Sequence, residues 1–97
     1  PRLSSAASDV YKRQEPMEVP TGWSIQEDHL MREFSFENFT DAKTFVDEIS
    51  VICEEKNHHA DLHFGWGYVV IELTTHDLGK VTSLDVEVAL AINSLEV

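Results

Sequence analysis

The 97-residue sequence contains a single cysteine, Cys53, and no long apolar run. One cysteine cannot form an intrachain disulfide, so the signature of an oxidising compartment is absent and we expect a cytoplasmic protein. A helix that crosses a bilayer needs ~20 predominantly apolar residues. No stretch of the sequence approaches that length, so we expect no membrane-spanning segment.

Basic residues are also scarce. Seven Lys and Arg stand against 18 Asp and Glu, which gives a formal net charge of -11. Proteins that bind nucleic acid or anionic lipid usually carry clustered positive charge, and none is clustered here. The four glycines, at positions 22, 65, 67 and 79, do not form a phosphate-binding loop. These absences argue against nucleic acid, membrane surfaces and nucleotides as partners.

The length allows one domain with one modest core, and so small a domain is often stabilised by oligomerisation. Residues 1–16 are rich in Ser, Ala and charge and show no clear periodicity. We interpret them as a disordered or non-native leader. Residues 17–97 are then the folded domain.

Hydrophobic periodicity in the first half of this domain predicts two strands and a helix. Residues 23–27 and 30–36 alternate loosely and fit a hairpin that turns at 27–29. A helix is expected to open near Asn38 to Thr40, with Asp41 in its first turn. Its apolar positions recur every three or four residues: Phe39, Ala42, Phe45, Val46, Ile49 and Ile52 or Cys53.

The second half repeats this order. Leu62 and Phe64 precede Gly65-Trp66-Gly67, and residues 68–75 are β-branched and aromatic, as in a hairpin with a tight turn. A last helix should start at Thr82 or Ser83, because Thr82-x-x-Asp85 matches a capping box. Its expected apolar stripe is Leu84, Val88, Ala91, Ile92 and Leu95. The order β-β-α-β-β-α predicts an α+β domain, a four-stranded antiparallel sheet with helices packed on one face.

Three of the five histidines fall at the ends of these elements. His58 and His59 follow the long helix, and His76 follows the strongest strand. If the hairpins and helix pack as expected, these ends can converge on one edge of the sheet, where neutral and charged imidazoles could donate and accept protons. The alternative is that they are solvated loop residues.

A metal site is the main rival interpretation of these histidines. His59, Asp61 and His63 alternate, so on a strand they would share one face, and His76 or Cys53 could complete a ligand set. However, the sequence lacks CxxC, HExxH and other zinc spacings. We therefore expect no metal.

Cys53 lies on a helix that looks buried, where a thiol is usually inert as a nucleophile.

Four further side chains each have a functional and a structural interpretation. Trp23 and Trp66 could stack on a flat heterocycle, or be a core aromatic and a turn-capping aromatic. Glu54 could orient a histidine or be a solvated acid. Asp85 is already explained as a helix-capping acid.

Two segments resemble motifs of the pterin-4a-carbinolamine dehydratase family: Glu54-Glu55-Lys56-Asn57-His58-His59-Ala60-Asp61, and the strand end Thr74-Thr75-His76-Asp77. That family carries an acid, three residues, a His-His pair, usually Pro, then Asp or Glu. A later strand ends in Thr-His, and the following helix carries an Asp, which Asp85 matches. Ala60 stands where the family usually has Pro, and this departure loosens the loop of the His-His pair.

The resemblance extends from Gly22 to about Leu95, through Gly22-Trp23 and the aromatic pattern Phe34-Ser35-Phe36 with Phe39. It implies dehydration of 4a-hydroxytetrahydropterin to quinonoid dihydropterin without a metal or redox cofactor. It also implies that His58, His59 and His76 are the acid and base groups. The remaining residues that it places at the pterin site are Trp23, Glu54, Ala60, Thr75, Asp77, Leu78 and Asp85.

The same resemblance implies a homodimer or homotetramer that pairs sheet edges and packs the long helices together. Members of the family also serve as dimerisation or assembly partners of other proteins. A protein-interaction module without catalytic activity is therefore the alternative function.

Overall fold

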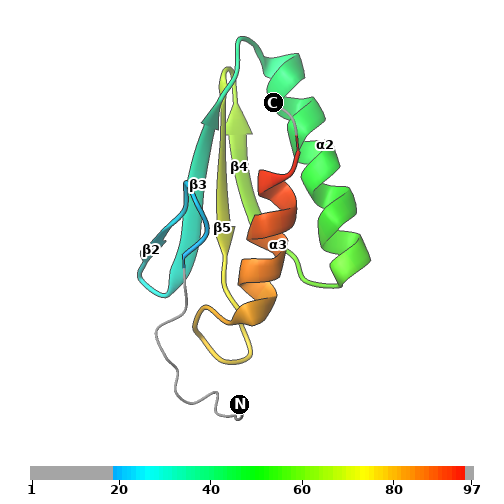
Figure 1. Cartoon of the computed structure of the whole chain (residues 1–97). Helices are drawn as coiled ribbons and strands as arrows, with labels where there is room; N and C mark the ends of the chain where they lie inside the picture. Colours follow the sequence, from blue (N-terminus) through cyan, green and yellow to red (C-terminus); the bar gives the residue numbers. More distant parts are fainter. Residues whose placement is uncertain (1–18, 96–97) are drawn as a thin grey trace.

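The computed structural model describes residues 19–95, which fold into a sheet with two helices on one of its faces (Figure 1). The elements in chain order are β2 (Ser24–Gln26), β3 (His29–Ser35), α2 (Phe39–Lys56), β4 (Asp61–Gly65), β5 (Tyr68–Leu73) and α3 (Ser83–Asn93). This confirms the predicted β-β-α-β-β-α order and the α+β class. The expected leader, residues 1–16, lies outside the described residues. Within residues 19–95, neither helix is long and apolar enough to cross a membrane.

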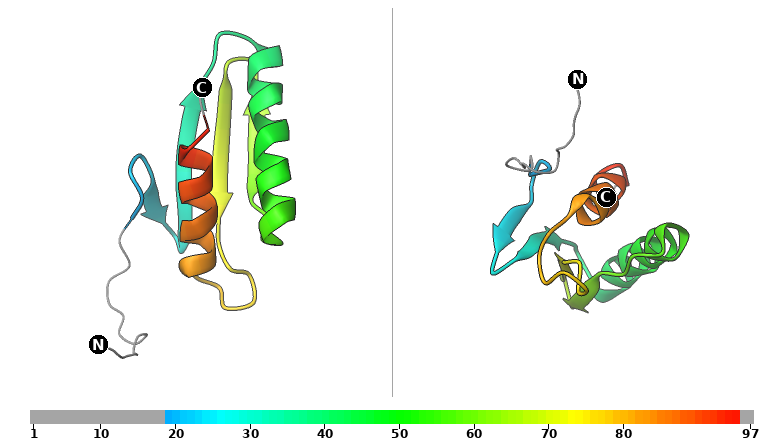
Figure 2. Two further views of the ribbon diagram at one scale, coloured as in Figure 1. Left: turned by 45° about the vertical axis from the view of Figure 1, so that its right-hand side comes forward. Right: turned by 90° about the horizontal axis from the view of Figure 1, so that it is seen from below.

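The four strands pair antiparallel in the order β2-β3-β5-β4, so β5 lies between β3 and β4. Alternate residues of a strand point to opposite faces. The inward face of β5 carries Val69, Ile71 and Leu73, all fully buried, as the alternation predicted. Opposite them on β3 lie Phe34 and Leu30, which pair with Val69 and Leu73. Figure 2 shows α2 and α3 together over this face.

Two strands are shorter than predicted: those expected over 23–27 and 68–75 span 24–26 and 68–73. The β2–β3 hairpin turns at Glu27 and Asp28, which both have positive φ, as in the two-residue turns that fit the twist of a hairpin. β5 ends at Leu73, whose partner Leu30 lies at the start of β3. Thr74 and Thr75, expected to continue the strand, instead bond through their hydroxyls to Asp28 and Asp85.

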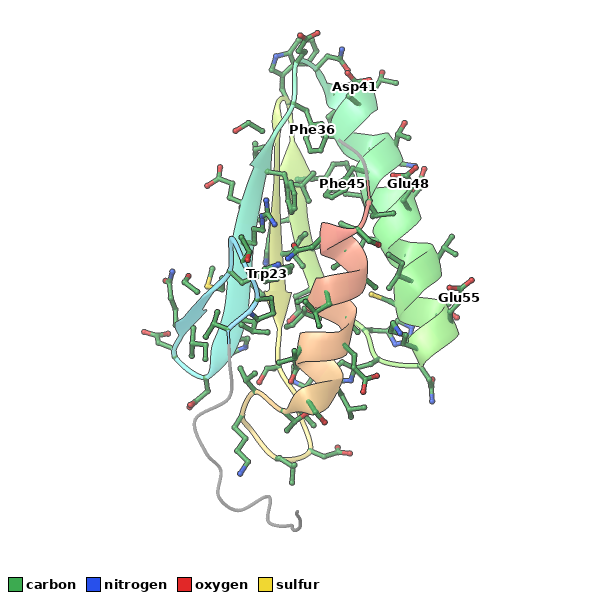
Figure 3. The ribbon with its side chains drawn as sticks, in the orientation of Figure 1. Trp23, Phe36, Asp41, Phe45, Glu48 and Glu55 are labelled. Atoms are coloured by element: carbon green, nitrogen blue, oxygen red, sulfur yellow. The ribbon has the colours of Figure 1, made fainter. Side chains whose placement is uncertain are left out.

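The long helix α2 begins as the sequence predicts. The side chain of its N-cap, Asn38, accepts a hydrogen bond from the backbone N–H of Asp41 at 2.8 Å. The expected stripe is buried at Ala42, Phe45, Val46, Ile49 and Cys53. Phe39 is the exception: it is exposed, and its ring packs on that of Phe64 with the centroids 5.4 Å apart. Figure 3 shows Phe36 and Phe45 between the sheet and α2.

The inward face of α3 shares Val88 and Ile92 with the predicted stripe and differs from it elsewhere. Its capping box with Thr82 and Asp85 is confirmed. However, Leu84 is 47% exposed, and the buried positions are Asp85, Val88, Ala89 and Ile92. Asp85 faces inward because its carboxylate has polar partners there. The neighbouring residue, Leu84, therefore points outward.

Two glycines provide a matched test of the turns. Gly67 has φ +85°, and a Cβ there would lie 3.2 Å from the carbonyl oxygen of Phe36. Gly79 has φ +67°, and a Cβ there would meet no atom within 4 Å. Both Gly67→Ala and Gly79→Ala should lose about 1 kcal/mol of unfolding free energy through the left-handed backbone. Gly67→Ala should lose more, because of the clash. Urea denaturation measures both, and equal losses would contradict this role of the Phe36 contact.

Candidate active site

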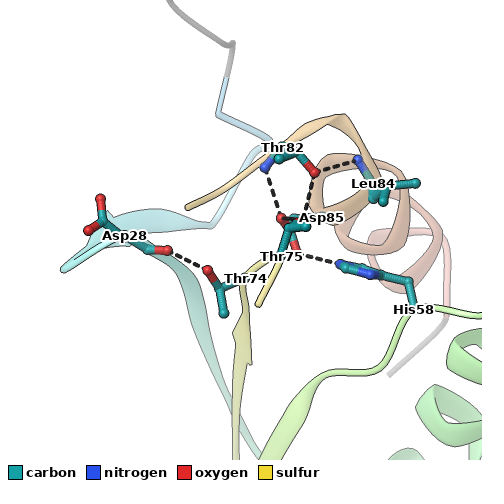
Figure 4. A network of polar contacts seen from close by, with 7 residues as sticks. All are labelled: Asp28, His58, Thr74, Thr75, Thr82, Leu84 and Asp85. Atoms are coloured by element: carbon teal, nitrogen blue, oxygen red, sulfur yellow. Dashed lines mark hydrogen bonds and ion pairs between the residues drawn. The ribbon is translucent and has the colours of Figure 1, made fainter. Parts of the chain in front are cut away.

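A buried carboxylate organises the end of the domain where β5, α3 and the loop after α2 meet. Asp85 lies in the first turn of α3 and is fully buried. Its Oδ2 accepts hydrogen bonds from the backbone N–H of Thr82 and the hydroxyl of Thr75, both at 2.8 Å. Its Oδ1 lies 2.6 Å from Nε2 of His58 (Figure 4). A buried carboxylate is costly unless it is hydrogen-bonded, and these contacts meet that requirement.

The end of α2 positions His58 beside this carboxylate. Asn57 adopts the left-handed conformation, with φ 54°, and so terminates the helix. The backbone N–H of His58 then donates to the carbonyl oxygen of Cys53 at 3.1 Å. The side chain of His58 remains 13% exposed. Its imidazole is therefore held on Asp85 through Nε2, and a small part of the side chain remains in contact with solvent.

His59 has a different environment from its neighbour. Its Nε2 lies 2.7 Å from Oε2 of Glu54, which stands on the last turn of α2. Both side chains are exposed, the glutamate by 76%. Glu54 therefore combines features of both interpretations: it contacts a histidine, and it is a solvated acid. The adjacent histidines are held by two separate carboxylates, one buried and one solvated.

His76, Asp77 and Leu78 occupy an exposed loop that β5 leads into. Thr75 closes this loop, because its backbone N–H donates to the carbonyl oxygen of Lys80 at 3.0 Å and its carbonyl accepts from Gly79 at 2.8 Å. The loop begins one residue from the Asp85 network. Among the described residues, the structure shows no hydrogen bond between His76 and either His58 or His59. The convergence of all three imidazoles therefore stays a prediction.

Trp23 lies away from these histidines. It is 7% exposed, and its indole N–H donates to Oδ1 of Asn93 at 2.8 Å. The guanidinium of Arg32 donates to the same oxygen at 2.6 Å. Asn93 is eight residues beyond Asp85 on α3, which corresponds to about 12 Å along the helix axis. The structure thus gives Trp23 the core interpretation, and its contact with pterin stays a prediction.

The thiol of Cys53 is unsuited to nucleophilic chemistry. Burial raises its pKa, the Glu54 carboxylate raises it further, and the backbone N–H of Ala60 acts in the opposite direction. The thiol therefore stays protonated at neutral pH, as the sequence suggested. Ala60 is half-buried and packs against the core.

The rival metal ligands are also separated. The imidazole of His63 pairs with Glu72 at 3.3 Å on the helix-free face of the sheet, whereas His59 pairs with Glu54. Within residues 19–95, no three His, Cys, Asp or Glu side chains are grouped so that they could hold a metal ion.

The hydroxyl contact between Thr75 and Thr82 was missed from the sequence. Their oxygens lie 2.6 Å apart. The capping box identified Thr82 only as a partner of Asp85 within the same helical turn. The link to β5 depends on how α3 docks against the sheet, and local sequence patterns carry no signal for it.

Known proteins are similar to this chain in sequence. The model of the family described as "Pterin 4 alpha carbinolamine dehydratase" matches residues 4–95. A protein of Prochlorococcus marinus subsp. pastoris is 45% identical over 74 residues, which cover 76% of this chain and 77% of that protein. One from Sulfurisphaera tokodaii is 38% identical over 74 residues, covering 76% of this chain and 80% of the relative. Both carry the name "Putative pterin-4-alpha-carbinolamine dehydratase".

Solved structures are similar as well. The transcriptional coactivator/pterin dehydratase from Brucella melitensis superposes with a TM-score of 0.72 at 28% identity, over 76% of this chain and 81% of that one. A pterin dehydratase-like protein identified as a RuBisCO assembly factor in the α-carboxysome gives a TM-score of 0.60 at 22% identity. It covers 74% of this chain and 83% of its own, and shows a common fold.

The two carboxylate–histidine pairs should differ in their contribution to stability. His58→Ala leaves the buried Asp85 without one partner, which should cost about 2 kcal/mol of unfolding free energy. His59→Ala breaks an exposed pair and should leave the free energy unchanged within error. Urea denaturation of the two variants measures this difference. Equal effects would contradict the structural distinction between the pairs.

Proposed function

The chain belongs to the pterin 4 alpha carbinolamine dehydratase family, and from this premise we propose that it dehydrates 4a-hydroxytetrahydropterin to quinonoid dihydropterin and water. The observation that carries the proposal is the His58–Asp85 pair. A buried carboxylate holds the imidazole of a histidine whose side chain is still 13% exposed. His59 is the next residue, and the loop of His76 begins beside Thr75, which bonds to the same carboxylate.

The reaction needs two proton transfers. The lone pair of the pterin N5 expels the 4a-hydroxyl group while a general acid protonates the departing oxygen. A general base removes the proton of a ring N–H. Each properly placed proton transfer accelerates a reaction by about 10²–10⁴-fold. His58, His59 and His76 are the groups that we propose for these transfers, and the chemistry requires neither a metal nor a redox cofactor.

The proposed substrate is a small heterocycle, and we place it beside the histidines. We propose that residues 58–60 form one wall of the pterin site and residues 76–78 the other. Leu78 is an exposed large apolar side chain in the His76 loop and offers a surface for an apolar ring face. Asp77 adds a hydrogen-bond acceptor beside it. Glu54 holds His59 at 2.7 Å and so would act on the substrate indirectly.

An interaction module is the second candidate. Val51 on α2 and Leu90 on α3 are both more than half exposed, which gives the helical layer apolar positions that a partner could cover. Two related structures are named for such roles, one as a transcriptional coactivator/pterin dehydratase and one as a RuBisCO assembly factor. We propose that these positions mediate association of this chain with itself, as a dimer or tetramer.

Catalysis can be tested with freshly generated 4a-hydroxytetrahydropterin, whose dehydration is followed by absorbance. The wild type should accelerate the reaction, and His58→Ala and His76→Ala should each reduce kcat/KM by about 100-fold, since each removes one proton transfer. His63→Ala is the matched control, because this histidine lies on the helix-free face and should leave the rate unchanged. An inactive wild type, or undiminished rates in both variants, would refute the proposed function.

Association can be tested by light scattering during size exclusion. The wild type should run as a dimer or tetramer. Val51→Glu should shift the population toward smaller species, because it would bury a charge wherever two α2 helices pack. A monomeric wild type at micromolar concentration would contradict self-association and would favour a different protein as the partner of the helical layer.

A further inference from the structure

The hydroxyl groups around Asp85 can each donate only one hydrogen bond, and this determines the direction of the whole network. The hydroxyl of Thr75 donates to Oδ2 of Asp85 at 2.8 Å. Toward Thr82, whose oxygen is 2.6 Å away, Thr75 can therefore only accept. The Thr82 hydroxyl must donate to Thr75, and its own oxygen accepts from the backbone N–H of Leu84 at 3.3 Å. The donors run in one direction, from Thr82 to Thr75 to Asp85.

This direction determines whether Asp85 accepts or donates the hydrogen bond to His58. Its Oδ2 already receives two donors, from Thr75 and from the backbone of Thr82. An ionised carboxylate only accepts hydrogen bonds. The 2.6 Å contact between Oδ1 and Nε2 of His58 therefore requires a proton on that nitrogen.

We propose that this relay of Thr82, Thr75 and Asp85 holds neutral His58 in the tautomer protonated at Nε2 and presents Nδ1, proton-free, to the site. Given the proposed function, Nδ1 is then the base. It takes the ring N–H proton as the C4a–O bond breaks, and the oxygen leaves as water with a proton from another histidine. The imidazolium so formed keeps its Nε2–H on Asp85.

The relay changes the role expected of Thr75. The family resemblance implies that Thr75 lies at the pterin site. In the structure Thr75 is buried, and its hydroxyl both donates to Asp85 and accepts from Thr82. Thr75 and Thr82 are therefore positioning residues that act through Asp85 on His58.

His59 has no comparable constraint. Its Nε2 also meets a carboxylate, but Glu54 is exposed and solvent competes for both groups. We therefore expect His59 to populate both tautomers. This difference assigns the base to His58 and leaves the acid to a histidine that exchanges protons freely with solvent, His59 or His76.

Substitution of Asp85 by Asn gives a sharp test. The Thr75 hydroxyl and the Thr82 backbone N–H still point at the position of Oδ2, so the amide oxygen must take that place. The amide NH₂ then faces His58, and because NH₂ only donates, Nε2 must lose its proton. In Asp85→Asn the tautomer of His58 should reverse.

Long-range ¹H–¹⁵N NMR of the histidine rings, recorded at alkaline pH, reads this directly. The wild type should show a protonated-type shift at Nε2 of His58 and an unprotonated-type shift at Nδ1, and Asp85→Asn should exchange them. The other four histidines serve as internal controls. A wild-type His58 protonated at Nδ1, or an Asp85→Asn spectrum without reversal, would overturn the inference.

Kinetics tests the two hydroxyls with a matched control on the neighbouring residue. Thr75→Val removes the donor to Asp85 and should lower kcat about tenfold without changing KM, because it acts on the orientation of His58. Thr75→Ser should restore the rate to within twofold. Thr74→Val removes an equally buried hydroxyl that donates to the carbonyl of Asp28 at 2.8 Å, outside the relay, and should keep the wild-type rate. Equal rates in Thr75→Val and Thr74→Val would overturn the inference.

The NMR measurement needs no turnover, so the two hypotheses fail separately. An inactive wild type with the expected tautomer, reversed in Asp85→Asn, would support the relay and refute the dehydratase. An active wild type in which His58 is protonated at Nδ1 would refute the relay and leave the dehydratase in place.

Discussion

The carboxylate of Asp85 joins three parts of the chain that are distant in sequence. It caps the first turn of α3 through the backbone of Thr82, holds the end of β5 through Thr75, and fixes the loop after α2 through His58. A buried carboxylate is stable only while its donors are present, and here they come from all three segments. The docking of α3, the end of β5 and the position of His58 therefore depend on the same carboxylate. The geometry of the site is coupled in this way to the stability of the domain.

The same arrangement explains why three histidines can have unequal roles. The core strand β5, with Val69, Ile71 and Leu73 fully buried, provides a rigid support that ends beside Asp85. The contact with Asp85 holds the His58 imidazole against this support. His59 is bound only to an exposed glutamate, and His76 lies on an exposed loop. Proton transfer benefits from one precisely oriented group and from others that exchange protons with solvent. A small domain without a metal ligand cluster among its described residues can supply both kinds.

Local sequence patterns predicted the features that depend on neighbouring residues. The turn at Glu27 and Asp28, the Asn38 cap and the capping box at Thr82 all follow from short-range chemistry. The features that were missed depend on tertiary packing. The apolar pattern placed Leu84 inward because it cannot show that Asp85 has buried partners on another strand. For the same reason the sequence did not reveal that Trp23 bonds to Asn93, 70 residues away. The histidines were identified by resemblance to a family, and the spacing alone left them open to a metal interpretation.

In the proposed mechanism His58, held by Asp85, acts on the pterin through Nδ1. A crystal structure of the protein with a bound pterin analogue tests this most directly. The analogue should lie between residues 58–60 and residues 76–78, with a ring nitrogen within hydrogen-bond distance of Nδ1 and the His58–Asp85 contact intact. An analogue bound elsewhere, or one that meets Nε2 of a rotated His58, would contradict it.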